Sequence, residues 1–471
     1  MVHWLLLKER SKKLSRKNYA KQTDKYHQRL TKIGEIKQIG ERKMLKAYRG
    51  ELLHFLADPA KVALEDSYQY IADGLLIIQD GLIAQVGEAA ELLPTLDASV
   101  AVTHYENGLI MPGFIDTHVH YPQTEMIASY GEQLLEWLEN YTFPFERQFS
   151  DLEHGKNVAE FFLSQLLEAG TTTALVFGTV HKESVEAFFT IAQQKKLRMI
   201  CGKVLMDQNC PDYLSDTAQS GYDDSKALIE KWHNVDRLQY AITPRFAPTC
   251  STQQLNKAGQ LLHENPSVYL HTHLSENKAE IAWVKALFPD SDSYLDVYDK
   301  SKLLGRRSIF AHGVHLHDNE CRRLGETNSA IAFCPSSNLF LGSGLFNLKQ
   351  AQEHNINVGL GSDIGAGTTF SMLSTINEGY KTQQLRGDKL SPFQSFYLAT
   401  LGGAIALDLE GTIGNFVKGA EADFIVLDYH ATPLMDRRMQ HCTNLSEKLF
   451  ILSMLGDERH VKATHIMGVR V

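Results

Sequence analysis

The sequence predicts an α/β fold, a (β/α)8 TIM-type barrel with a small β-sandwich domain built from both chain termini. Short apolar segments rich in β-branched residues alternate with helical segments through the middle of the chain. Polar side chains that can bind a metal follow four of these segments, as is typical of the carboxyl mouth of such a barrel. Alternating stretches with turn residues flank them on both sides, which favours a β-rich unit assembled from the two ends.

The chain divides into four predicted parts. In order, these are a basic N-terminal extension at 1–43, the first part of the β-sandwich at 44–108, the barrel at 109–408, and the second part of the sandwich with a C-terminal helix at 409–471. A chain of 471 residues is long enough for a barrel of about 250 residues and a small additional domain.

The predicted extension differs from the rest of the chain in charge. Residues 1–43 carry 13 Lys/Arg and 4 Asp/Glu, a net charge of +9, so the net charge of −9 for the chain leaves −18 on the remainder. We expect the extension to be solvated or disordered, or to reflect a wrongly assigned start upstream of Met44. Its apolar stretch, residues 2–7, is too short for a membrane span and lacks the features of a signal peptide.

The two parts of the β-sandwich are predicted from short stretches of alternating apolar and polar residues and from turn residues. Residues 73–83 hold an apolar run between two Asp-Gly pairs, and residues 413–428 and 461–471 show the same character.

Eight strands are expected in the barrel. Their approximate ranges are 109–118, 172–177, 199–205, 239–245, 268–273, 308–312, 331–334 and 356–361. Helical spacing of apolar residues between them, for example at 158–167 and 185–192, completes the alternation.

The first barrel strand ends in two histidines, His118 and His120. Side chains at i and i+2 of a strand share a face and lie roughly 6.5 to 7 Å apart, so both imidazoles can reach one ion. The chain has 20 histidines, and such spacing occurs three times, so this pair alone is weak evidence for a metal site.

Later strand ends repeat the pattern and strengthen it. His273, His312 and Asp363 each follow an apolar strand, and the carboxyl ends of barrel strands face one mouth. His271 lies on the same face as His273 but deeper, where a supporting or core role is expected. The third pair, at 315 and 317, precedes a helix start, where solvent or capping roles are expected.

Motifs at these positions resemble those of the amidohydrolase superfamily. They are Pro112-Gly-Phe-Ile-Asp-Thr-His-Val-His120, His273-Leu-Ser-Glu276, His312-Gly313 and Gly361-Ser-Asp363, together with the split β flanks. Residues 121–123, 134–144 and 244–248 closely resemble the guanine-deaminating branch of that superfamily. The similarity covers about residues 45–471. It implies hydrolytic, metal-dependent deamination of guanine to xanthine and ammonia in purine catabolism, a hydrolase acting on a cyclic amidine C–N bond.

The resemblance implies one Zn²⁺ per subunit. Its ligands would be His118, His120, His273 and Asp363, with His312 either a further ligand or a hydrogen-bond partner of the metal's water. Three imidazoles, a carboxylate and water suit zinc, although the same ligands also suit iron. Two-metal relatives bridge their ions with a modified lysine, and the fourth strand has none, so one metal is expected. The third strand does carry a lysine, Lys203, for which a structural or surface role is expected.

Catalysis is expected from three side chains. Asp363 would take a proton from the attacking water, Glu276 would pass a proton to a ring nitrogen, and His312 would act at the edge of the metal. Glu276 could alternatively be a helix-start residue that favours the helix dipole.

Substrate recognition is expected from Gln123 and Arg245, with Phe246, Trp137 and Glu276 completing the pocket. The alternatives are a loop-surface position for Gln123, an ion pair for Arg245 and core packing for Phe246. An amide offers one donor and one acceptor to a purine, and a guanidinium donates to a carbonyl and a ring nitrogen. Phe246 and Trp137 could supply apolar faces, although core packing is favoured for Trp137.

Other functions are disfavoured to different degrees. A related enzyme acting on another purine, a pyrimidine or a triazine remains the main alternative, to be separated by a substrate panel. A non-catalytic scaffold would be expected to lose metal ligands, and the zinc-deaminase signature of the cytidine-deaminase fold is missing. The acidic body argues against nucleic-acid binding. Six scattered cysteines suit a reducing compartment, so a cytoplasmic protein without membrane contact is expected, and the resemblance suggests a homodimer.

Overall fold

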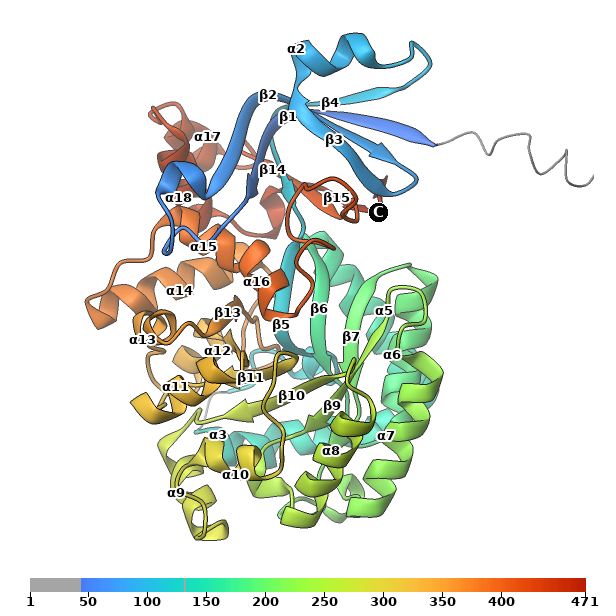
Figure 1. The fold of residues 1–471 in the computed structure, drawn as a ribbon, viewed down its shortest axis with the longest axis vertical. Helices are drawn as coiled ribbons and strands as arrows, with labels where there is room; N and C mark the ends of the chain where they lie inside the picture. The colour runs from blue at the N-terminus through green and yellow to red at the C-terminus, as the bar shows by residue number, and fades with distance from the viewer. Residues whose placement is uncertain (1–43, 131–132) are drawn as a thin grey trace, which may run out of the picture. The chain divides into compact units, whose positions relative to one another are not determined.

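The computed structural model of the protein describes residues 44–130 and 133–471. The predictions made for residues 1–43 lie outside the described residues. Two sheets organise the described part of the chain, one a barrel and the other a sheet formed by the two ends of that part (Figure 1).

Eight parallel strands form the barrel, and each strand pairs with the next one along it. In spatial order they are β5 (Phe114–His120), β6 (Thr171–Phe177), β7 (Arg198–Gly202), β9 (Gln239–Pro244), β10 (Tyr269–Leu274), β11 (Ser308–His312), β12 (Ala330–Phe333) and β13 (Asn357–Leu360). A two-residue strand, β8 (Val204–Leu205), adds to β9.

The last barrel strand, β13, contacts the first, β5, and these contacts nearly close the barrel. The Thr117 hydroxyl donates to the carbonyl of Leu360 at 2.9 Å, and the backbone N–H of Asp363 donates to the carbonyl of His118 at 2.9 Å. These contacts join two of the strand ends that carry predicted metal ligands.

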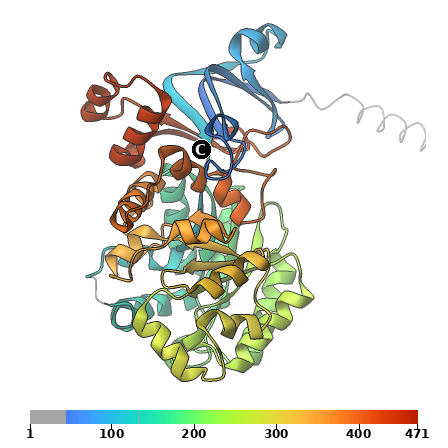
Figure 2. The same ribbon diagram turned by 60° about the vertical axis from the view of Figure 1, so that its left-hand side comes forward.

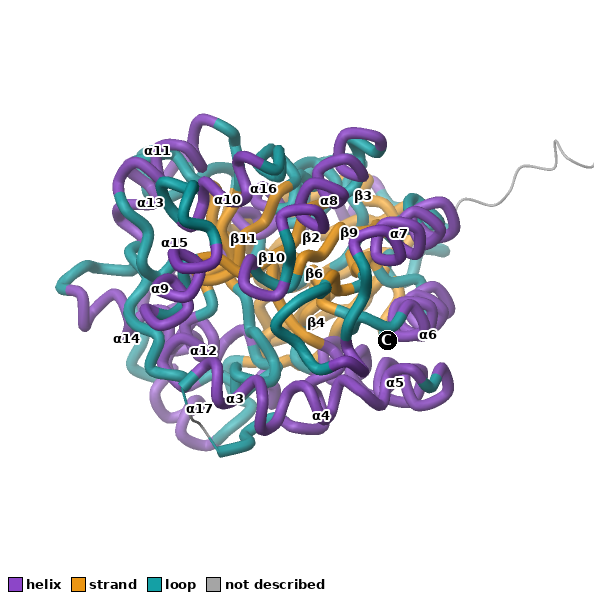
Figure 3. Tube along the Cα trace, turned by 90° about the horizontal axis from the view of Figure 1, so that it is seen from below, coloured by secondary structure: helices purple, strands orange, loops and turns teal. Residues whose placement is uncertain are grey.

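Helices surround the barrel strands, as Figure 3 shows from below. The outer helices after successive strands are α5 (Leu152–Glu168), α6 (Lys182–Gln194), α7 (Ala218–Trp232), α8 (Thr252–Glu264), α9 (Lys278–Leu287), α10 (Tyr294–Lys300), α11 (Asp318–Glu326), α12 (Pro335–Phe340), α13 (Leu348–Glu353), α14 (Met372–Arg386), α15 (Pro392–Leu398) and α16 (Leu401–Ala406). Each long helix buries one apolar stripe against the strands, as Phe162, Leu163 and Leu166 do in α5. The predicted helical segments 158–167 and 185–192 lie in α5 and α6.

A chain of short helices between β5 and α5 forms part of the barrel mouth. It runs through η3 (Tyr121–Met126), α3 (Leu134–Trp137), η4 (Leu138–Thr142), α4 (Phe143–Glu146) and η5 (Arg147–Ser150). Its buried side chains Met126, Trp137 and Phe143 belong to one apolar cluster with Phe246, which follows β9. This segment therefore supplies a wall above the strand ends.

The two ends of the described chain form one mixed sheet of seven strands. In spatial order these are β16 (Val469–Arg470), β15 (Val461–Ile466), β14 (Phe424–Asp428), β4 (Val102–Pro112), β1 (Leu45–Phe55), β2 (Tyr68–Gln79) and β3 (Leu82–Glu88). The sheet has a core of its own, which includes Leu52, Ile110 and Val426. It meets the barrel through Glu421, which accepts hydrogen bonds from Arg198 and Arg237. Figures 1 and 2 show this sheet at one end of the barrel.

The remaining helices are short and lie between strands of this sheet. They are η1 (Leu64–Asp66), α2 (Ala89–Leu92), η2 (Leu93–Thr95), α17 (Pro433–Met439), α18 (Leu445–Leu455) and η8 (Glu458–His460), with η6 (Asp212–Leu214) and η7 (Ala247–Thr249) in barrel loops. In the described residues, no helix is both long and apolar enough to cross a bilayer.

Two predicted details were wrong. The segment 109–118 is not one strand, because residues up to Pro112 pair with β14 in the terminal sheet and β5 begins at Phe114. The helices of the second sandwich part are not C-terminal, since α17 and α18 precede β15 and β16. The predicted strand boundaries elsewhere fall within a few residues of those observed.

Candidate metal centre and substrate cavity

Five predicted metal-site residues come together at the carboxyl ends of four barrel strands. His118 and His120 lie on β5, His273 on β10, and His312 at the last position of β11, while Asp363 follows β13. The strand ends bend sharply, because His312 and Asp363 have φ values of 73° and 54°, which are uncommon for residues other than glycine. At these turns, both side chains point toward a common centre.

The ligand atoms of four residues each lie within 3.3 Å of at least one of the others. Nε2 of His120 is 3.2 Å from Nε2 of His118 and 3.3 Å from Nε2 of His273. Oδ1 of Asp363 is 3.1 Å from His118 Nε2 and 3.3 Å from His120 Nε2. His312 Nε2 lies farther out, 3.8 Å from Oδ2 of Asp363.

Hydrogen bonds on the opposite ring nitrogens orient these imidazoles. Nδ1 of His273 donates to the carbonyl of Arg245 at 2.6 Å, so Nε2 of the neutral ring carries a lone pair toward the centre. Nδ1 of His118 pairs with Nε2 of His271 at 2.7 Å. The expected supporting position of His271 is therefore what the structure has.

His312 is oriented by a residue of the helix that follows β12. Nδ1 of His312 donates to Oδ1 of Asn338 at 2.9 Å, and Asn338 ends the run Pro335-Ser336-Ser337-Asn338 in α12. His312 Nε2 is buried and has no hydrogen-bond partner in the described residues. It faces both Asp363 and Glu276, at 3.8 and 3.4 Å.

The protonation of the cluster fits a cation. Burial lowers the pKa of His120 to about 3 and that of His273 well below its ordinary value, so the rings are neutral and can act as ligands. Burial opposes ionisation of Asp363, yet the neighbouring histidines, His118 first, hold its pKa well below the usual range. Two neutral nitrogens repel each other when no proton lies between them, and the Nε2 atoms here are 3.2 to 3.3 Å apart. A divalent cation among them would remove that repulsion.

Glu276 lies beside this centre in a buried loop before α9. Its Oε2 is 3.4 Å from His312 Nε2, and its Oε1 accepts a hydrogen bond from the Ser343 hydroxyl at 3.2 Å. Burial, then the nearby Asp363 charge, raises the pKa of Glu276 to about 8. Its backbone N–H donates to Glu280 at 2.9 Å, which fixes the loop. A carboxyl group held in this way can carry a proton near neutral pH.

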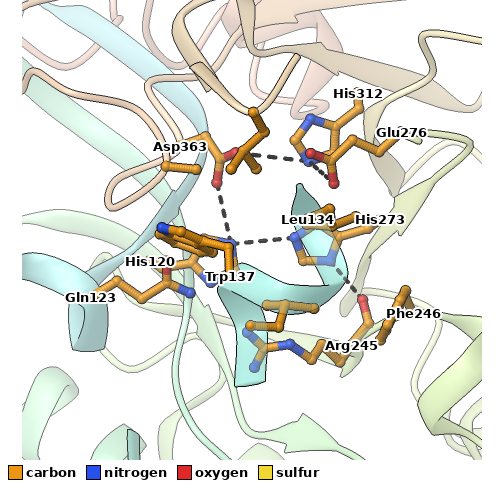
Figure 4. Close-up of a pocket in the computed structure, with 13 residues that line it drawn as sticks. His120, Gln123, Leu134, Trp137, Arg245, Phe246, His273, Glu276, His312 and Asp363 are labelled. Atoms are coloured by element: carbon orange, nitrogen blue, oxygen red, sulfur yellow. Dashed lines mark hydrogen bonds and ion pairs between the residues drawn. The ribbon is translucent and has the colours of Figure 1, made fainter. Parts of the chain in front are cut away.

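The predicted recognition residues line a cavity next to the candidate metal centre (Figure 4). Gln123 and Arg245 lie on one side of His120 and His273, and Asp363 lies on the other. The cavity wall also includes the predicted side chains of Phe246, Trp137 and Glu276. Trp137, for which core packing was favoured, both belongs to the apolar cluster and borders the cavity. Its indole Nε1 is buried and has no hydrogen-bond partner in the described residues.

Arg245 forms a buried ion pair, the alternative considered for it in the sequence, with a partner that the sequence did not identify. Its Nη1 donates to both carboxylate oxygens of Glu146, at 3.0 and 2.8 Å, and the guanidinium lies over the Phe143 ring at 5.4 Å. The amide of Gln123 donates to Glu146 Oε1 at 3.3 Å. Glu146 lies two residues beyond the segment 134–144, and nothing in the sequence marked it.

Three residues weighed in the sequence lie away from the cavity wall. His317 is the N-cap of α11, as expected, whereas Nε2 of His315 bonds to the carbonyl of Ser343 at 2.8 Å behind Glu276. Lys203 forms a buried ion pair with Asp216 at 2.5 Å, which agrees with its expected structural role.

Comparison with known proteins places the chain in a family. The model of the Amidohydrolase family matches residues 109–471. The chain belongs to the amidohydrolase family. Guanine deaminase of Escherichia coli strain K12 is 53% identical over 427 residues, which cover 90% of this chain and 97% of that protein.

Two solved structures support this membership in the amidohydrolase family. The E. coli guanine deaminase structure has a TM-score of 0.87 and 51% identity, covering 91% of this chain and 99% of that one. A guanine deaminase from C. acetobutylicum with bound guanine in the active site has a TM-score of 0.82 and 31% identity, covering 91% and 100%. The family is metal-dependent, which agrees with the convergent histidines.

Proposed function

We propose that the protein is a guanine deaminase, which hydrolyses the C2–N bond of guanine to give xanthine and ammonia. The observation that carries the proposal is the cavity in which Gln123 and Arg245 face a cluster of three histidines and Asp363. The amide and guanidinium match the donors and acceptors of a purine edge. The 53% identity to the E. coli guanine deaminase over nine-tenths of the chain supports the same substrate.

The metal is proposed to be one Zn²⁺ per subunit. His118, His120, His273 and Asp363 would hold it, and His312, which is farther from the cluster, would contact the metal's water. Neutral imidazoles and one carboxylate are ligands that zinc prefers. When bound, zinc supplies a water acidic enough to act as the nucleophile near neutral pH.

The protein side chains then move the protons. Asp363 takes a proton from the attacking water, and His312 orients that water through Nε2. This nitrogen is available to the water because Nδ1 makes the hydrogen bond to Asn338. Glu276 gives a proton to a ring nitrogen as the C2 carbon becomes tetrahedral. The proton held by Asp363 then passes to the amine, which leaves as ammonia, and the hydroxyl group on C2 returns a proton to Glu276 as it becomes the carbonyl of xanthine. A raised pKa, to about 8, lets the Glu276 carboxyl hold its proton before the reaction.

Recognition of the ring divides between polar and apolar groups. Arg245 donates to the C6 carbonyl, and Gln123 pairs with ring nitrogens. Phe246 and Trp137 enclose the ring faces. Adenine lacks the carbonyl and carries its amine at C6, so it should be a poor substrate.

The cellular location and the oligomeric state of the enzyme are also proposals. All six cysteines are free thiols, which supports a cytoplasmic location. A homodimer is proposed from the resemblance to the family.

The decisive experiment is an assay of ammonia and xanthine release from purified protein loaded with zinc. Guanine should be the preferred substrate in a panel that also contains adenine, adenosine, cytosine and a triazine. Faster turnover of any other member of the panel would replace the proposal by another activity of the amidohydrolase family.

A further inference from the structure

We propose that Glu146 is a positioning residue for substrate recognition, whose one carboxylate sets the orientation of both Gln123 and Arg245. The inference rests on the proposed function and deepens it. It predicts that selectivity for a purine with a C6 carbonyl depends on a residue that does not touch the substrate.

Glu146 joins the two recognition side chains directly. Its Oε1 accepts from Gln123 Nε2 at 3.3 Å and from Arg245 Nη1 at 3.0 Å, and its Oε2 accepts from the same Nη1 at 2.8 Å. All three side chains are buried, with relative exposures of 0% for Glu146 and 2% for the other two. Charge-assisted hydrogen bonds in such a site are strong and fix geometry.

The three residues differ in what they face. Gln123 and Arg245 border the cavity, whereas Glu146 is not part of its wall. Both carboxylate oxygens are already used by protein donors, so Glu146 acts through its two partners.

The contacts decide which donors and acceptors remain for a ligand. In the described residues, Glu146 occupies only Nη1 of the guanidinium, which leaves Nε and Nη2 as donors. The Gln123 amide accepts from the backbone N–H of Gly365 at 3.0 Å and gives one N–H to Glu146, which leaves its second N–H and the other lone pair of Oε1. If the carboxylate were absent, the amide could rotate and the guanidinium could turn toward other acceptors.

Glu146 also balances charge. Arg245 is a buried cation in a cavity that adjoins a proposed divalent metal, and a buried charge without a partner is costly. The carboxylate neutralises that cation without entering the cavity. Both α4 residues that contact the guanidinium, Phe143 and Glu146, lie one helical turn apart, so a single short helix supplies the support.

The test measures equilibrium binding of two purines that cannot be deaminated at C2. Hypoxanthine carries the C6 carbonyl and purine does not, and neither has an amine. For the zinc-loaded protein, Glu146→Gln should weaken hypoxanthine binding by about 10-fold or more and change purine binding by less than about 3-fold. Metal content should stay at the wild-type value, because Glu146 contacts no metal ligand side chain.

Glu421→Gln is the matched control. Glu421 also pairs with arginines, Arg198 and Arg237, but at the opposite end of the barrel, so it should leave both affinities unchanged. If Glu146→Gln does not fold, Glu146→Asp keeps the charge but withdraws it by one methylene group, and a smaller loss in the same direction is expected.

Two results would overturn the inference. One is an unchanged affinity for hypoxanthine, and the other is an equal loss of affinity for both ligands, which would indicate a general defect of the cavity. Failure of the proposed function is a separate result, because it would appear in the wild-type protein as absent guanine turnover.

Discussion

At the scale of single residues, Glu276 combines burial, a neighbouring anion and a hydrogen bond at one carboxyl group. Its pKa of about 8 follows from the first two, and Ser343 holds Oε1 in place. Glu276→Gln keeps the size but removes the proton, so kcat should fall by about 10² to 10⁴-fold. Steady-state kinetics and metal analysis check this, with Glu153→Gln on the exposed face of α5 as the control. Loss of the metal would instead make Glu276 a ligand.

Asn338 gives a second prediction at this scale. Its Oδ1 accepts the Nδ1 proton of His312, which leaves Nε2 free on the side of the cavity. Asn338→Leu removes the acceptor and frees the ring, so activity at saturating zinc should fall by about 10 to 100-fold, the usual effect of losing such a partner. Asn338→Asp keeps an acceptor and should retain more activity than Asn338→Leu. Equal activities of the two variants would contradict this role.

At the scale of elements, Gly113 separates two strands that the sequence predicted as one. A Cβ at this position would lie 2.2 Å from Oγ1 and 2.4 Å from Cγ2 of Thr172, a β-branched side chain with little freedom to move. Gly113→Ala should therefore lower the free energy of unfolding by about 1–3 kcal/mol. Urea denaturation measures the loss, and Thr172→Ala should recover part of it. Gly305→Ala is the control, because its nearest neighbour is Ser308 Oγ at 3.9 Å. Unchanged stability of Gly113→Ala would show that the strands shift freely.

The chain around Gly113 shows which part of the fold could be predicted from the sequence. Apolar runs located β6 and β11 closely, because burial on both faces leaves a signal within a few residues. The break at Gly113 left no such signal, because both sides of it are apolar and buried in different sheets. Long-range pairing decided the boundary.

At the scale of the whole molecule, local patterns located the residues that converge at the candidate metal site better than the side chains that support them. A histidine at a strand end is visible in the sequence, and the barrel topology brings such ends together. Glu146 and Asn338 act through contacts with residues 99 and 26 positions away, respectively, which no local pattern encodes. The resemblance to a family identified Gln123 and Arg245 but gave no reason to expect the carboxylate that joins them.

The metal should stabilise the entire barrel, because its proposed ligands come from strands that are neighbours only in the folded state. His118 and His120 belong to β5, His273 to β10, and Asp363 follows β13, so zinc can hold β5, β10 and β13 together only in the native protein. Binding to the native state alone at 100 times the dissociation constant adds about 2.7 kcal/mol. Chelation should therefore lower the melting temperature and abolish activity, and zinc should restore both. Asp363→Ala loses a ligand, so its melting temperature should respond far less to chelator and zinc. An equal response in Asp363→Ala would mean that the metal binds elsewhere.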